Sequence, residues 1–470
     1  MPIHIVQKGD NLWKLSQEYG VSVNRIISAN GLEEPGKLVS GEALFIPDAQ
    51  PRYTVRPGDT LQAIANRYDV TVKSIMDTNQ LKSPTSIYAG QRLTIPLLYH
   101  QVAEGETLTT IAASYNTTPQ AIQTANQLSS PSDIFVSQML KIPETPKPVI
   151  DVNGFLTQFG HQGARTLREH ENTLTYASPF AHRIEADGGL GDLDDVPIVQ
   201  TALRYGVLPM MAITNFSSTE TGTELAHTIL SSDPLQNTLI QNTVTMMKSK
   251  GYRGLNIDFE NVLPQDKDNY NQFLQKAANR LHAEGFFISS SLAPKTSADQ
   301  KGLLYEAHDY PVHGRLMDFV VLMTYEWGYR FGPPQAISPI GQIRKVLEYA
   351  VSVIPKNKIM MGFQVYARDW LLPHVKGMQA ETFDIQEAIS RALQYNATIQ
   401  YDASAQSPYY PYTDAQGKSH EVWFEDARSA QAKFELAKSF NLRGISYWVL
   451  DYPFPQNWAL LQDNFIISRK

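Results

Sequence analysis

The spacing of apolar residues along the chain changes near residue 148. Before it, short apolar runs alternate with stretches in which apolar residues recur every three or four positions. Leu12, Leu15 and Tyr19 recur in this way and predict a helix over residues 12–19, and a second helix is expected over 23–29. Short strands are expected at 4–6 and 43–46, the latter ended by a proline. This part of the chain therefore predicts small units of strand, helix, helix and strand.

After residue 148, longer apolar strands alternate with helical stretches, which is typical of parallel β/α architecture. Eight such strands within about 320 residues fit an enlarged (β/α)8 TIM barrel. The last two are too far apart for one connecting helix, so residues of about 375–425 are expected to form a small α+β insertion between strands 7 and 8. The eight strands are predicted at 149–155, 174–180, 207–214, 251–260, 286–292, 319–325, 359–366 and 444–450.

The predicted strand at 251–260 has an unusual polar face. Asn256, Asp258 and Glu260 alternate with apolar residues, and successive side chains of a strand point to opposite faces. Three polar groups on one face of a half-buried strand cost free energy unless they are hydrogen-bonded or in use. A helix N-cap would explain one of them but not three. The pattern favours an acid/base site at the C-terminal end of a barrel strand, where barrel enzymes keep their chemistry.

The first part of the chain is an internal repeat of three copies. Its glycines are 49 and then 47 residues apart, and an asparagine and a closing Ile-Pro pair keep the same spacing. Three landmarks in one register make chance repetition improbable. The expected domains are 1–49, 50–98 and 99–144, followed after a Pro-rich linker by a single large domain over 145–470. The repeated landmarks are Gly9, Gly58 and Gly105; Asn30, Asn79 and Asn126; and Pro47, Pro96 and Pro143.

The repeat resembles the LysM domain over residues 3–144, so each copy is expected to be a small βααβ domain. LysM modules bind N-acetylglucosamine polymers, either peptidoglycan or chitin, and the resemblance implies a shallow glycan-binding groove between two loops. The same residues could instead only cap helices and turn the chain. Weak modules in tandem bind a polymer more tightly than a single module does, because binding of one raises the effective concentration of the others. This would explain why the chain has three copies. The candidate glycan contacts are Gly9, Asp10, Asn11, Leu12, Asn30, Gly58, Asp59, Thr60, Asn79, Gly105, Glu106, Thr107 and Asn126.

The second part resembles glycoside hydrolase family 18. With the LysM repeats included, nearly the whole chain is similar to the spore-germination and cortex-fragment hydrolases of endospore-forming bacteria. One departure concerns Arg253 and Asn256, because the family usually has Asp at both positions. The motifs that carry the resemblance are Gly254-x-Asn256-x-Asp258-x-Glu260, Met323-Thr324-Tyr325, Tyr366-x-Arg368-Asp369-Trp370 and Trp448.

The resemblance assigns a role to each of these groups. Glu260 is expected to protonate the leaving oxygen, while the substrate's own 2-acetamido group replaces a carboxylate nucleophile. Asp258 is expected to orient the acetamide N–H, Tyr325 to donate a hydrogen bond to the acetamide oxygen, and Trp448 to form the floor under the −1 sugar. Asn256 is expected to donate a hydrogen bond to Asp258 without adding a charge, so that Asp258 ionises more readily than in relatives with Asp there.

Further candidates lie near the predicted C-terminal ends of strands and are expected to line the cleft. Two of them have an alternative: Glu326 a structural role, and Arg368 an ion pair with Asp369 that shapes the rim. The tyrosines of the insertion either belong to its core or stack on sugars, and their size favours the core. The further cleft candidates are Tyr176, Asn153, Tyr366, Arg368 and Glu326, and the tyrosines are Tyr401, Tyr409, Tyr410 and Tyr412.

Composition excludes several classes of protein. A net charge of −7 and a pI of about 5.9 argue against a nucleic-acid partner, which usually requires a basic face. No apolar run approaches the roughly 20 residues of a membrane span, and the N-terminal residues lack the pattern of a signal peptide. Cysteine is absent, which excludes disulfides and thiolate metal sites. The histidines show no metal-ligand spacing, so we expect neither metal nor cofactor.

The sequence as a whole predicts a hydrolase of spore-cortex peptidoglycan. It would be an N-acetylglucosaminidase that cleaves β-1,4 bonds after N-acetylglucosamine with retention, while the LysM modules bind the glycan. A chitinase or chitooligosaccharide hydrolase is an alternative. A carbohydrate-binding spore-coat protein that uses the barrel as a lectin is another, although retention of Glu260 counts against it. We expect a monomer associated with the spore coat or cortex or bound to the cell wall.

Overall fold

The structure is a computed structural model in which the chain divides into two compact units. The first comprises residues 1–147, 396–399 and 455–464, and the second comprises 148–395, 400–454 and 465–470. The residues described below are 3–47, 52–56, 58–68, 72, 75–76, 79, 81–88, 90–95, 99–103, 105–114, 117–136, 138–142 and 147–470.

In the first unit, each repeat pairs two short antiparallel strands and has its own apolar core. Helix α1 begins after Asn11, whose side chain caps it, and ends at Gly20 with φ +72°. The elements of the first copy agree with those predicted within one residue at each end. They are β1 (Ile3–Ile5), α1 (Leu12–Tyr19), α2 (Val23–Asn30) and β2 (Ala43–Phe45); then β3 (Arg52–Thr54), α3 (Leu61–Tyr68) and β4 (Arg92–Thr94); then β5 (Tyr99–Gln101), α5 (Leu108–Ser114), α6 (Pro119–Ala125) and β6 (Met139–Lys141). This unit also contains α16 (Pro455–Asn464).

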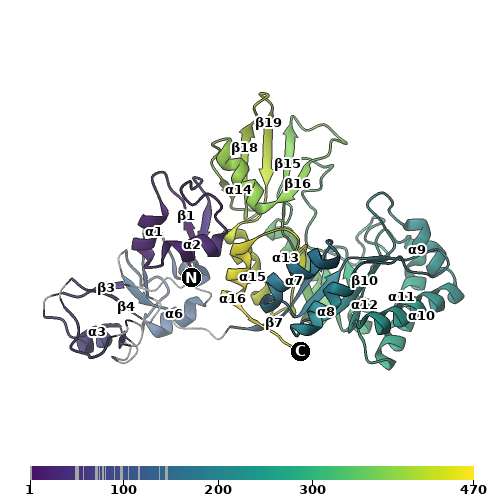
Figure 1. Ribbon diagram of the computed structural model, residues 1–470, viewed down its shortest axis with the longest axis horizontal. Helices are drawn as coiled ribbons and strands as arrows, with labels where there is room; N and C mark the ends of the chain where they lie inside the picture. Colours follow the sequence, from purple (N-terminus) through teal and green to yellow (C-terminus); the bar gives the residue numbers. More distant parts are fainter. Residues whose placement is uncertain are drawn as a thin grey trace. The chain divides into compact units, whose positions relative to one another are not determined.

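The second unit, which is described throughout, is built on a closed barrel of eight parallel strands, as predicted. Helices surround the barrel strands (Figure 1). The barrel strands are β7 (Val149–Leu156), β8 (Tyr176–Pro179), β10 (Leu208–Thr214), β11 (Gly254–Asp258), β12 (Phe287–Leu292), β13 (Phe319–Leu322), β14 (Ile359–Gln364) and β20 (Gly444–Trp448). The helices are α7 (Gly160–His170), α8 (Val196–Arg204), α9 (Thr223–Leu230), α10 (Asp233–Lys250), α11 (Lys267–Ala283), α12 (Tyr310–Leu316), α13 (Ile340–Val353) and α15 (Ala427–Ser439). Two short strands, β9 (His182–Arg183) and β21 (Ile466–Ile467), pair with β10 and β7.

The barrel interior changes from apolar to polar along its axis. At the N-terminal ends of the strands, Tyr176, Met210 and Phe319 form an apolar cluster. Further along, two buried asparagines each bond two serine hydroxyls: Asn153 with Ser178 and Ser446, and Asn256 with Ser289 and Ser291. These neutral pairs satisfy one another, so this layer of the interior is polar without carrying a charge.

Several strands end earlier than predicted, among them three that change where a candidate site residue lies. Strand β11 ends at Asp258, β13 at Leu322 and β14 at Gln364, so Glu260 and Tyr325 lie in the loops that follow. Tyr366 was expected at the end of the seventh barrel strand, but it begins β15 (Tyr366–Leu372) of the insertion. The insertion therefore starts before residue 375. Apolar alternation runs through both strands and did not reveal that β15 pairs antiparallel outside the barrel.

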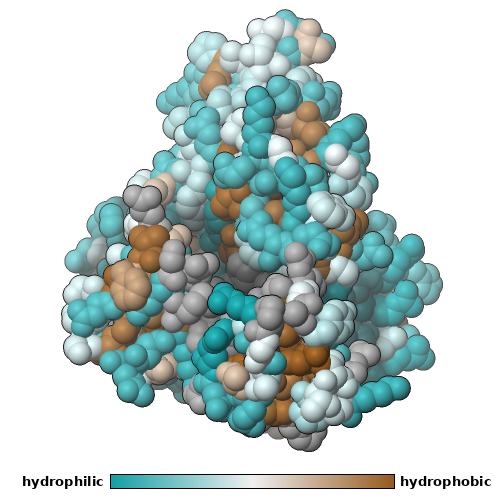
Figure 2. Space-filling view, turned by 90° about the vertical axis from the view of Figure 1, so that its left-hand side faces the viewer, coloured by the Kyte–Doolittle hydropathy of each residue, from teal (hydrophilic) through white to brown (hydrophobic). Residues whose placement is uncertain are grey.

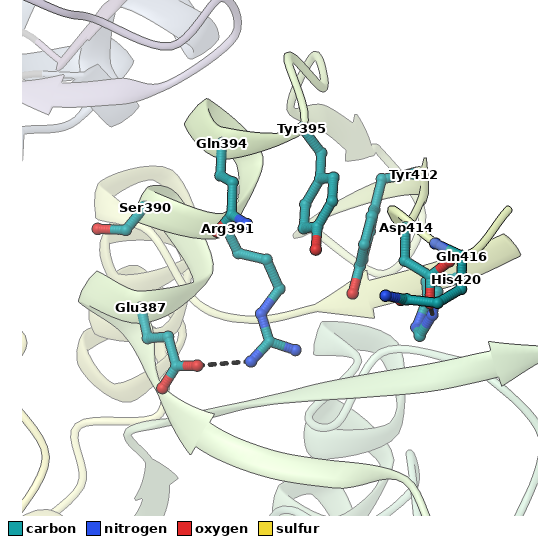
Figure 3. Close-up of a pocket in the computed structure, with 9 residues that line it drawn as sticks. All are labelled: Glu387, Ser390, Arg391, Gln394, Tyr395, Tyr412, Asp414, Gln416 and His420. Carbon is teal, nitrogen blue, oxygen red and sulfur yellow. Dashed lines mark hydrogen bonds and ion pairs between the residues drawn. The ribbon is translucent and has the colours of Figure 1, made fainter. Parts of the chain in front are cut away.

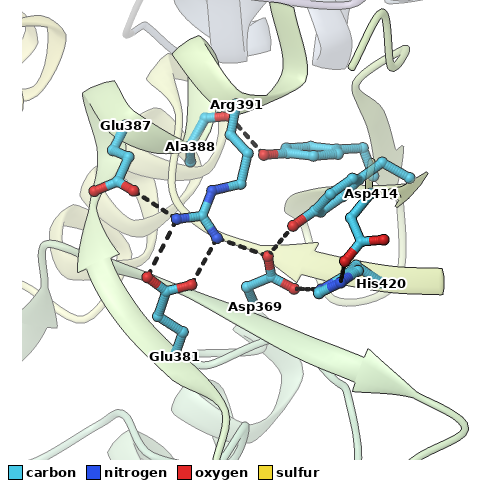
Figure 4. A network of polar contacts seen from close by, with 9 residues as sticks. Asp369, Glu381, Glu387, Ala388, Arg391, Asp414 and His420 are labelled. Carbon is cyan, nitrogen blue, oxygen red and sulfur yellow. Dashed lines mark hydrogen bonds and ion pairs between the residues drawn. The ribbon is translucent and has the colours of Figure 1, made fainter. Parts of the chain in front are cut away.

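The insertion is a five-stranded sheet with α14 (Ile385–Gln394) packed against it (Figure 1). Arg391 of α14 joins the helix to the sheet through Glu381 at 2.8 Å and Asp369 at 2.7 Å, and it also pairs with Glu387 at 2.5 Å (Figure 4). Asp369 accepts a further bond from His420 at 2.8 Å. The network fixes the position of α14 on the sheet. The remaining strands are β16 (Glu381–Asp384), β17 (Gln400–Asp402), β18 (Ser407–Thr413) and β19 (Ser419–Trp423).

Candidate active site

A cavity of about 480 Å³ opens beside the C-terminal end of β11. Three of the predicted site residues line it together, Glu260, Tyr325 and Glu326. The other lining residues come from the loops after β11, β12 and β13 and are mainly aromatic or apolar: Asn261, Pro294, Leu304, Tyr305, Met323, Trp327 and Tyr329. The cavity therefore lies where a (β/α)8 barrel keeps its chemistry.

Asp258 is the last residue of β11 and is 4% exposed. Its Oδ1 atom is buried and accepts no hydrogen bond from any described residue. Burial raises the pKa of Asp258 well above its ordinary value, and the neighbouring Glu260 raises it further. A buried acceptor without a donor is unfavourable, so this oxygen is poised to take a donor from a ligand.

Glu260 is half-buried and projects from the loop that follows β11. Burial, together with the negative charge of Glu326, raises the pKa of Glu260 from 4.5 to about 7. A carboxyl group with such a pKa carries its proton at weakly acidic pH and can donate it.

Asn256 does not make the predicted contact with Asp258. Its Nδ2 atom donates to Ser289 Oγ at 3.0 Å, and its Oδ1 atom accepts from Ser291 Oγ at 3.0 Å. Ser291 also hydrogen-bonds Asp258 and thereby lowers its pKa, against the larger effect of burial. A serine hydroxyl therefore stands between the two residues that were expected to meet, because the interior face of β12 (Phe287–Leu292) supplies the closer partners.

Tyr325 is 9% exposed and lies three residues beyond the end of β13. Burial and the nearby carboxylates of Asp258, Glu260 and Glu326 raise the pKa of Tyr325 well above its ordinary value, so its hydroxyl stays a donor. Gly362 makes room for the ring, since a Cβ there would lie 2.4 Å from the carbonyl oxygen of Leu322 and 2.9 Å from Tyr325 Cε1.

Glu326 faces the cavity in a left-handed backbone conformation, with φ +74°. Arg368 donates to both of its carboxylate oxygens, at 3.0 and 2.8 Å, and the Tyr366 hydroxyl also donates to it. Tyr366 and Arg368 therefore support Glu326 and do not themselves line the cavity. The alternative pairing of Arg368 with Asp369 is wrong, because adjacent side chains of β15 point to opposite faces.

Trp448 ends β20 and lies among aromatic rings. It contacts Phe180 edge-on at 4.7 Å between ring centroids and Phe155 at 5.7 Å. It also packs against the small cluster that contains Tyr325 and Tyr366. The structure therefore brings Trp448 near Tyr325, as an apolar surface.

Two predicted cleft residues are placed elsewhere. Tyr176 begins β8 and lies in the apolar layer at the N-terminal ends of the strands, where its hydroxyl bonds Asp151 at 3.0 Å. Asn153 is fully buried in the middle of β7, and two serines engage its amide. Both predictions are wrong because the sequence does not show which inward residue of each strand reaches the mouth of the barrel.

Most of the proposed LysM contacts maintain the fold of the repeat. Asn30 bonds Ile26 and both backbone groups of Phe45, which joins α2 to β2. Asn79 and Asn126 make the same three bonds in their own copies, so the amide groups are already used. Leu12 is buried in the core. These four residues are therefore corrected from glycan contacts to structural residues.

The remaining LysM candidates lie in the turn between the first strand and helix of each copy. Asp10, Asp59 and Glu106 each accept a backbone N–H three residues earlier and a side-chain bond from the preceding strand. Asn11, Thr60 and Thr107 accept a backbone N–H in the first turn of the helix. The glycines have φ of +94°, +87° and +83°, which favours glycine. These contacts support the capping alternative, and a glycan contact at the same turn stays a prediction.

The insertion has its own cavity of about 290 Å³, between α14 and the hairpin of β18 and β19 (Figure 3). None of the predicted catalytic residues lines it. The tyrosines around it pack on neighbours: Tyr410 is fully buried, and Tyr412 stacks between Tyr395 and His420 with centroids 4.6 Å from each. Tyr409 stacks on Trp423, and Tyr401 packs under Arg428. The structure therefore favours the core alternative for the insertion tyrosines.

Several residues with a possible functional role were not singled out in the sequence. The serines of the fifth strand contact Asn256 and Asp258, and Asn215 binds the backbone of Glu260. A polar residue directly after a predicted strand, as in Thr214-Asn215, was the available signal. In the repeats, Tyr88 and Phe135 are 70% and 69% exposed at equivalent turns, and Trp13 is 67% exposed. On the face seen in Figure 2, hydrophobic side chains form separate patches within a mainly polar surface.

Among the described residues, the structure offers neither a membrane-spanning helix nor a cluster of metal-binding side chains. No helix there combines the length and the apolar character that crossing a membrane requires. No group of three or more histidine, aspartate or glutamate side chains there is arranged to hold a metal ion.

Comparison with known proteins gives concordant matches. Residues 219–452 match the glycosyl hydrolases family 18, and residues 4–47, 53–96 and 100–143 match the LysM domain. The cortical fragment-lytic enzyme of Bacillus subtilis strain 168 is 47% identical over 330 residues, which are 69% of this chain and 77% of that protein. The putative sporulation-specific glycosylase YdhD of the same organism is 31% identical over the full length of both chains.

A solved structure matches the whole chain. The spore cortex-lytic enzyme SleL of Bacillus megaterium QM B1551 superposes with a TM-score of 0.81 at 36% sequence identity, covering 100% of this chain and 99% of that one. The order of domains and the closed barrel are thus shared along the entire length. The chain belongs to glycoside hydrolase family 18 and is a glycosidase that carries three LysM domains.

Proposed function

We propose that this glycosidase hydrolyses the peptidoglycan of the bacterial spore cortex. It would act as an N-acetylglucosaminidase on β-1,4 bonds after N-acetylglucosamine. The proposal is supported by the relatives, which are named as cortical fragment-lytic and spore cortex-lytic enzymes. It is also supported by the LysM repeats, whose family binds polymers that contain N-acetylglucosamine.

The observation that carries the mechanism is the unpartnered Oδ1 atom of Asp258. A sugar with a 2-acetamido group brings an N–H donor, which would satisfy this oxygen when bound. In the proposed mechanism Asp258 accepts that N–H and so turns the acetamide carbonyl oxygen toward C1. The hydroxyl of Tyr325, which burial keeps protonated, donates to the same carbonyl oxygen. Trp448 forms the apolar surface under the sugar ring.

Glu260 acts twice in the proposed reaction. It first transfers its proton to the glycosidic oxygen as the C1–O bond breaks, while the acetamide oxygen bonds to C1 and forms an oxazolinium ion. The Glu260 carboxylate then takes a proton from water as the water oxygen attacks C1. The bond between C1 and the acetamide oxygen breaks, which opens the oxazolinium ring. Two displacements at C1 give net retention of configuration, and Glu260 regains its proton.

The LysM repeats would keep the polymer near the barrel. Exposed rings at Trp13, Tyr88 and Phe135 offer flat surfaces on which sugars can stack. We further propose that the enzyme works as a monomer, since every candidate group comes from one chain, and that it acts while associated with the spore or the cell wall.

A Glu260→Gln variant tests the proposed acid. The full-length wild type is expected to release fragments with N-acetylglucosamine at the reducing end from spore-cortex glycan, as identified by mass spectrometry. Glu260→Gln is expected to lose at least about 100-fold in kcat while it still binds the glycan. Full turnover by this variant would show that the acid is misassigned.

The same assay separates the alternatives. Preferential cleavage of chitooligosaccharides over cortex glycan would favour a chitinase, which the shared acetamide chemistry also allows. If the wild type binds both polymers but generates no new reducing ends from either, the proposal of an N-acetylglucosaminidase is refuted.

A further inference from the structure

The backbone of Glu260 lies beyond the hydrogen-bond ladder of the barrel. Strand β11 ends at Asp258, whose last register partner is Thr214 on β10. The N–H and C=O groups of Glu260 therefore have no partner in the sheet. The chain turns immediately afterwards, at Asn261 with φ +53°. Something other than the sheet has to hold this residue in place.

The side chain of Asn215 supplies both missing partners. Its Oδ1 atom accepts the Glu260 N–H at 2.9 Å, and its Nδ2 atom donates to the Glu260 carbonyl oxygen at 2.8 Å. Asn215 directly follows Thr214 and is fully buried. The backbones of β10 and β11 pair as far as Thr214 and Asp258. Beyond that point, the side chain of Asn215 takes the place of a neighbouring strand and binds the backbone of Glu260.

Asn215 is itself held by the loop that leads into α9. Its Nδ2 atom also donates to the carbonyl oxygen of Gly222 at 3.1 Å. Gly222 has φ +68°, and a Cβ there would lie 1.9 Å from the backbone oxygen of Asn215. The close approach holds the two backbones together, and the bond to the Gly222 carbonyl orients the amide toward Glu260.

His308 holds the Phe259–Glu260 peptide through its carbonyl group, whereas Asn215 holds the N–H group of the same peptide. Its Nδ1 atom accepts the backbone N–H of Ala293 at 2.9 Å, so Nε2 carries the proton and donates to the carbonyl oxygen of Phe259 at 2.9 Å. The ring is 1% exposed, and burial lowers the pKa of His308 to about 4. It is therefore neutral, with one tautomer, throughout the range in which Glu260 titrates.

We propose that Asn215 and His308 are positioning residues that clamp the Phe259–Glu260 backbone and so aim the carboxyl group of Glu260 at the scissile bond. The inference rests on the proposed role of Glu260 as the acid. Three hydrogen bonds from two loops fix a residue that the sheet leaves unsupported. Displacement of a reacting group by about 1 Å can lower a rate by about 100-fold, so such a clamp has a measurable effect.

Conservative substitutions at Asn215 and His308 test whether these hydrogen bonds position Glu260. Asn215→Asp keeps the acceptor for the Glu260 N–H but faces the Glu260 carbonyl with an oxygen. His308→Asn keeps a group near the Nδ1 position but no longer reaches Phe259, whereas His308→Gln can place a donor near the Nε2 position. Turnover of glycan fragments prepared from spore cortex is measured as kcat and KM separately, beside the thermal midpoint of the full chain.

We expect kcat to fall about 10- to 100-fold in Asn215→Asp and His308→Asn, with KM changed less than threefold. His308→Gln should recover much of the loss. Gln236→Leu is the matched control, since Gln236 is a buried amide on α10 that donates to the Leu230 carbonyl at 2.7 Å. This control should lower the thermal midpoint but leave kcat unchanged.

The proposal is overturned if both variants fold and keep the wild-type kcat, or if Gln236→Leu loses as much kcat as they do at a comparable drop in thermal midpoint. If Asn215→Asp does not fold, the His308 pair decides alone, and equal kcat in His308→Asn and His308→Gln overturns the proposal. Failure of the proposed function has a different signature, because the wild type itself would then release no reducing ends from cortex glycan, and misassignment of the acid would leave Glu260→Gln active.

Discussion

At the scale of single residues, the candidate site separates two carboxyl groups by their surroundings. Asp258 is enclosed within the barrel, whereas Glu260 stands in the loop above and lines the cavity. The pKa of each is raised, chiefly by burial. Glu260 can thus serve as an acid that the substrate reaches, while Asp258 can accept a hydrogen bond from a donor on the substrate. The sequence predicted both roles through the resemblance, but not Ser291, which contacts both Asn256 and Asp258.

The proton on Glu260 sets an expected pH dependence. Because a general acid must be protonated, kcat/KM of the wild type should fall as pH rises through about 7, the raised pKa of Glu260. The charge of Glu326 contributes to that pKa, so Glu326→Gln should move this limb of the profile to lower pH. The measurement is kcat/KM against pH for both proteins. A limb that stays in place in Glu326→Gln would contradict this coupling.

Asn256→Asp tests the neutral residue beneath Asp258. A carboxylate there would add a like charge near Asp258 and raise the pKa of the group that titrates second. The pH–rate profile should therefore change on its acidic side. Asn153→Asp provides a control, since Asn153 has the same two-serine environment on β7. An unchanged profile in Asn256→Asp would remove the idea that the neutral amide matters.

At the scale of elements, the barrel, the repeats and the insertion could be predicted from apolar periodicity, and the fold class is confirmed. The ends of strands could not be predicted. The run from Phe319 to Tyr325 reads as one strand, yet β13 ends at Leu322. Periodicity also does not show which inward residue reaches the mouth, which is why Tyr176 and Asn153 were misplaced. The strand ends and the residues at the mouth depend on pairing between segments that are distant in the sequence. The local pattern of apolar residues carries no information about that pairing.

The asparagine of each repeat is expected to be a stability determinant. Asn30→Ala would leave the N–H and C=O groups of Phe45 without the partners that the side chain supplies inside a small core. The expected cost is about 2–4 kcal/mol of local stability, from unsatisfied buried groups. Hydrogen exchange of β2 amides in the full chain measures it, with the exposed Asn24→Ala on the same helix as control. Equal protection in both variants would show that the bonds contribute little.

At the scale of the whole molecule, the three repeats and the barrel are expected to act on one polymer. When one module binds a long glycan, it raises the local concentration of that glycan for the other modules on the chain. The reductions in affinity caused by substitutions in several modules should therefore multiply on long glycans. The combined variant Trp13→Ala, Tyr88→Ala and Phe135→Ala should bind insoluble cortex at least about 10-fold more weakly, while kcat on short soluble fragments is unchanged. Pull-down with intact cortex measures the first and reducing-end release the second. Full retention on cortex would exclude these rings as contacts.

The uncharged layer of asparagine and serine in the barrel has a consequence for proton exchange. Below Asp258 and Glu260 the interior offers amides and hydroxyls that already satisfy one another, and none of them is an acid or base near neutral pH. We therefore expect protons to reach the pair mainly from the cavity at the mouth, which Glu260 lines. A sugar that covers the mouth should therefore slow exchange of protons between the pair and the bulk solvent until water enters for the second step of the reaction. The acidity of the medium would then select which enzyme molecules begin a turnover, and have less influence on the first step of one already begun.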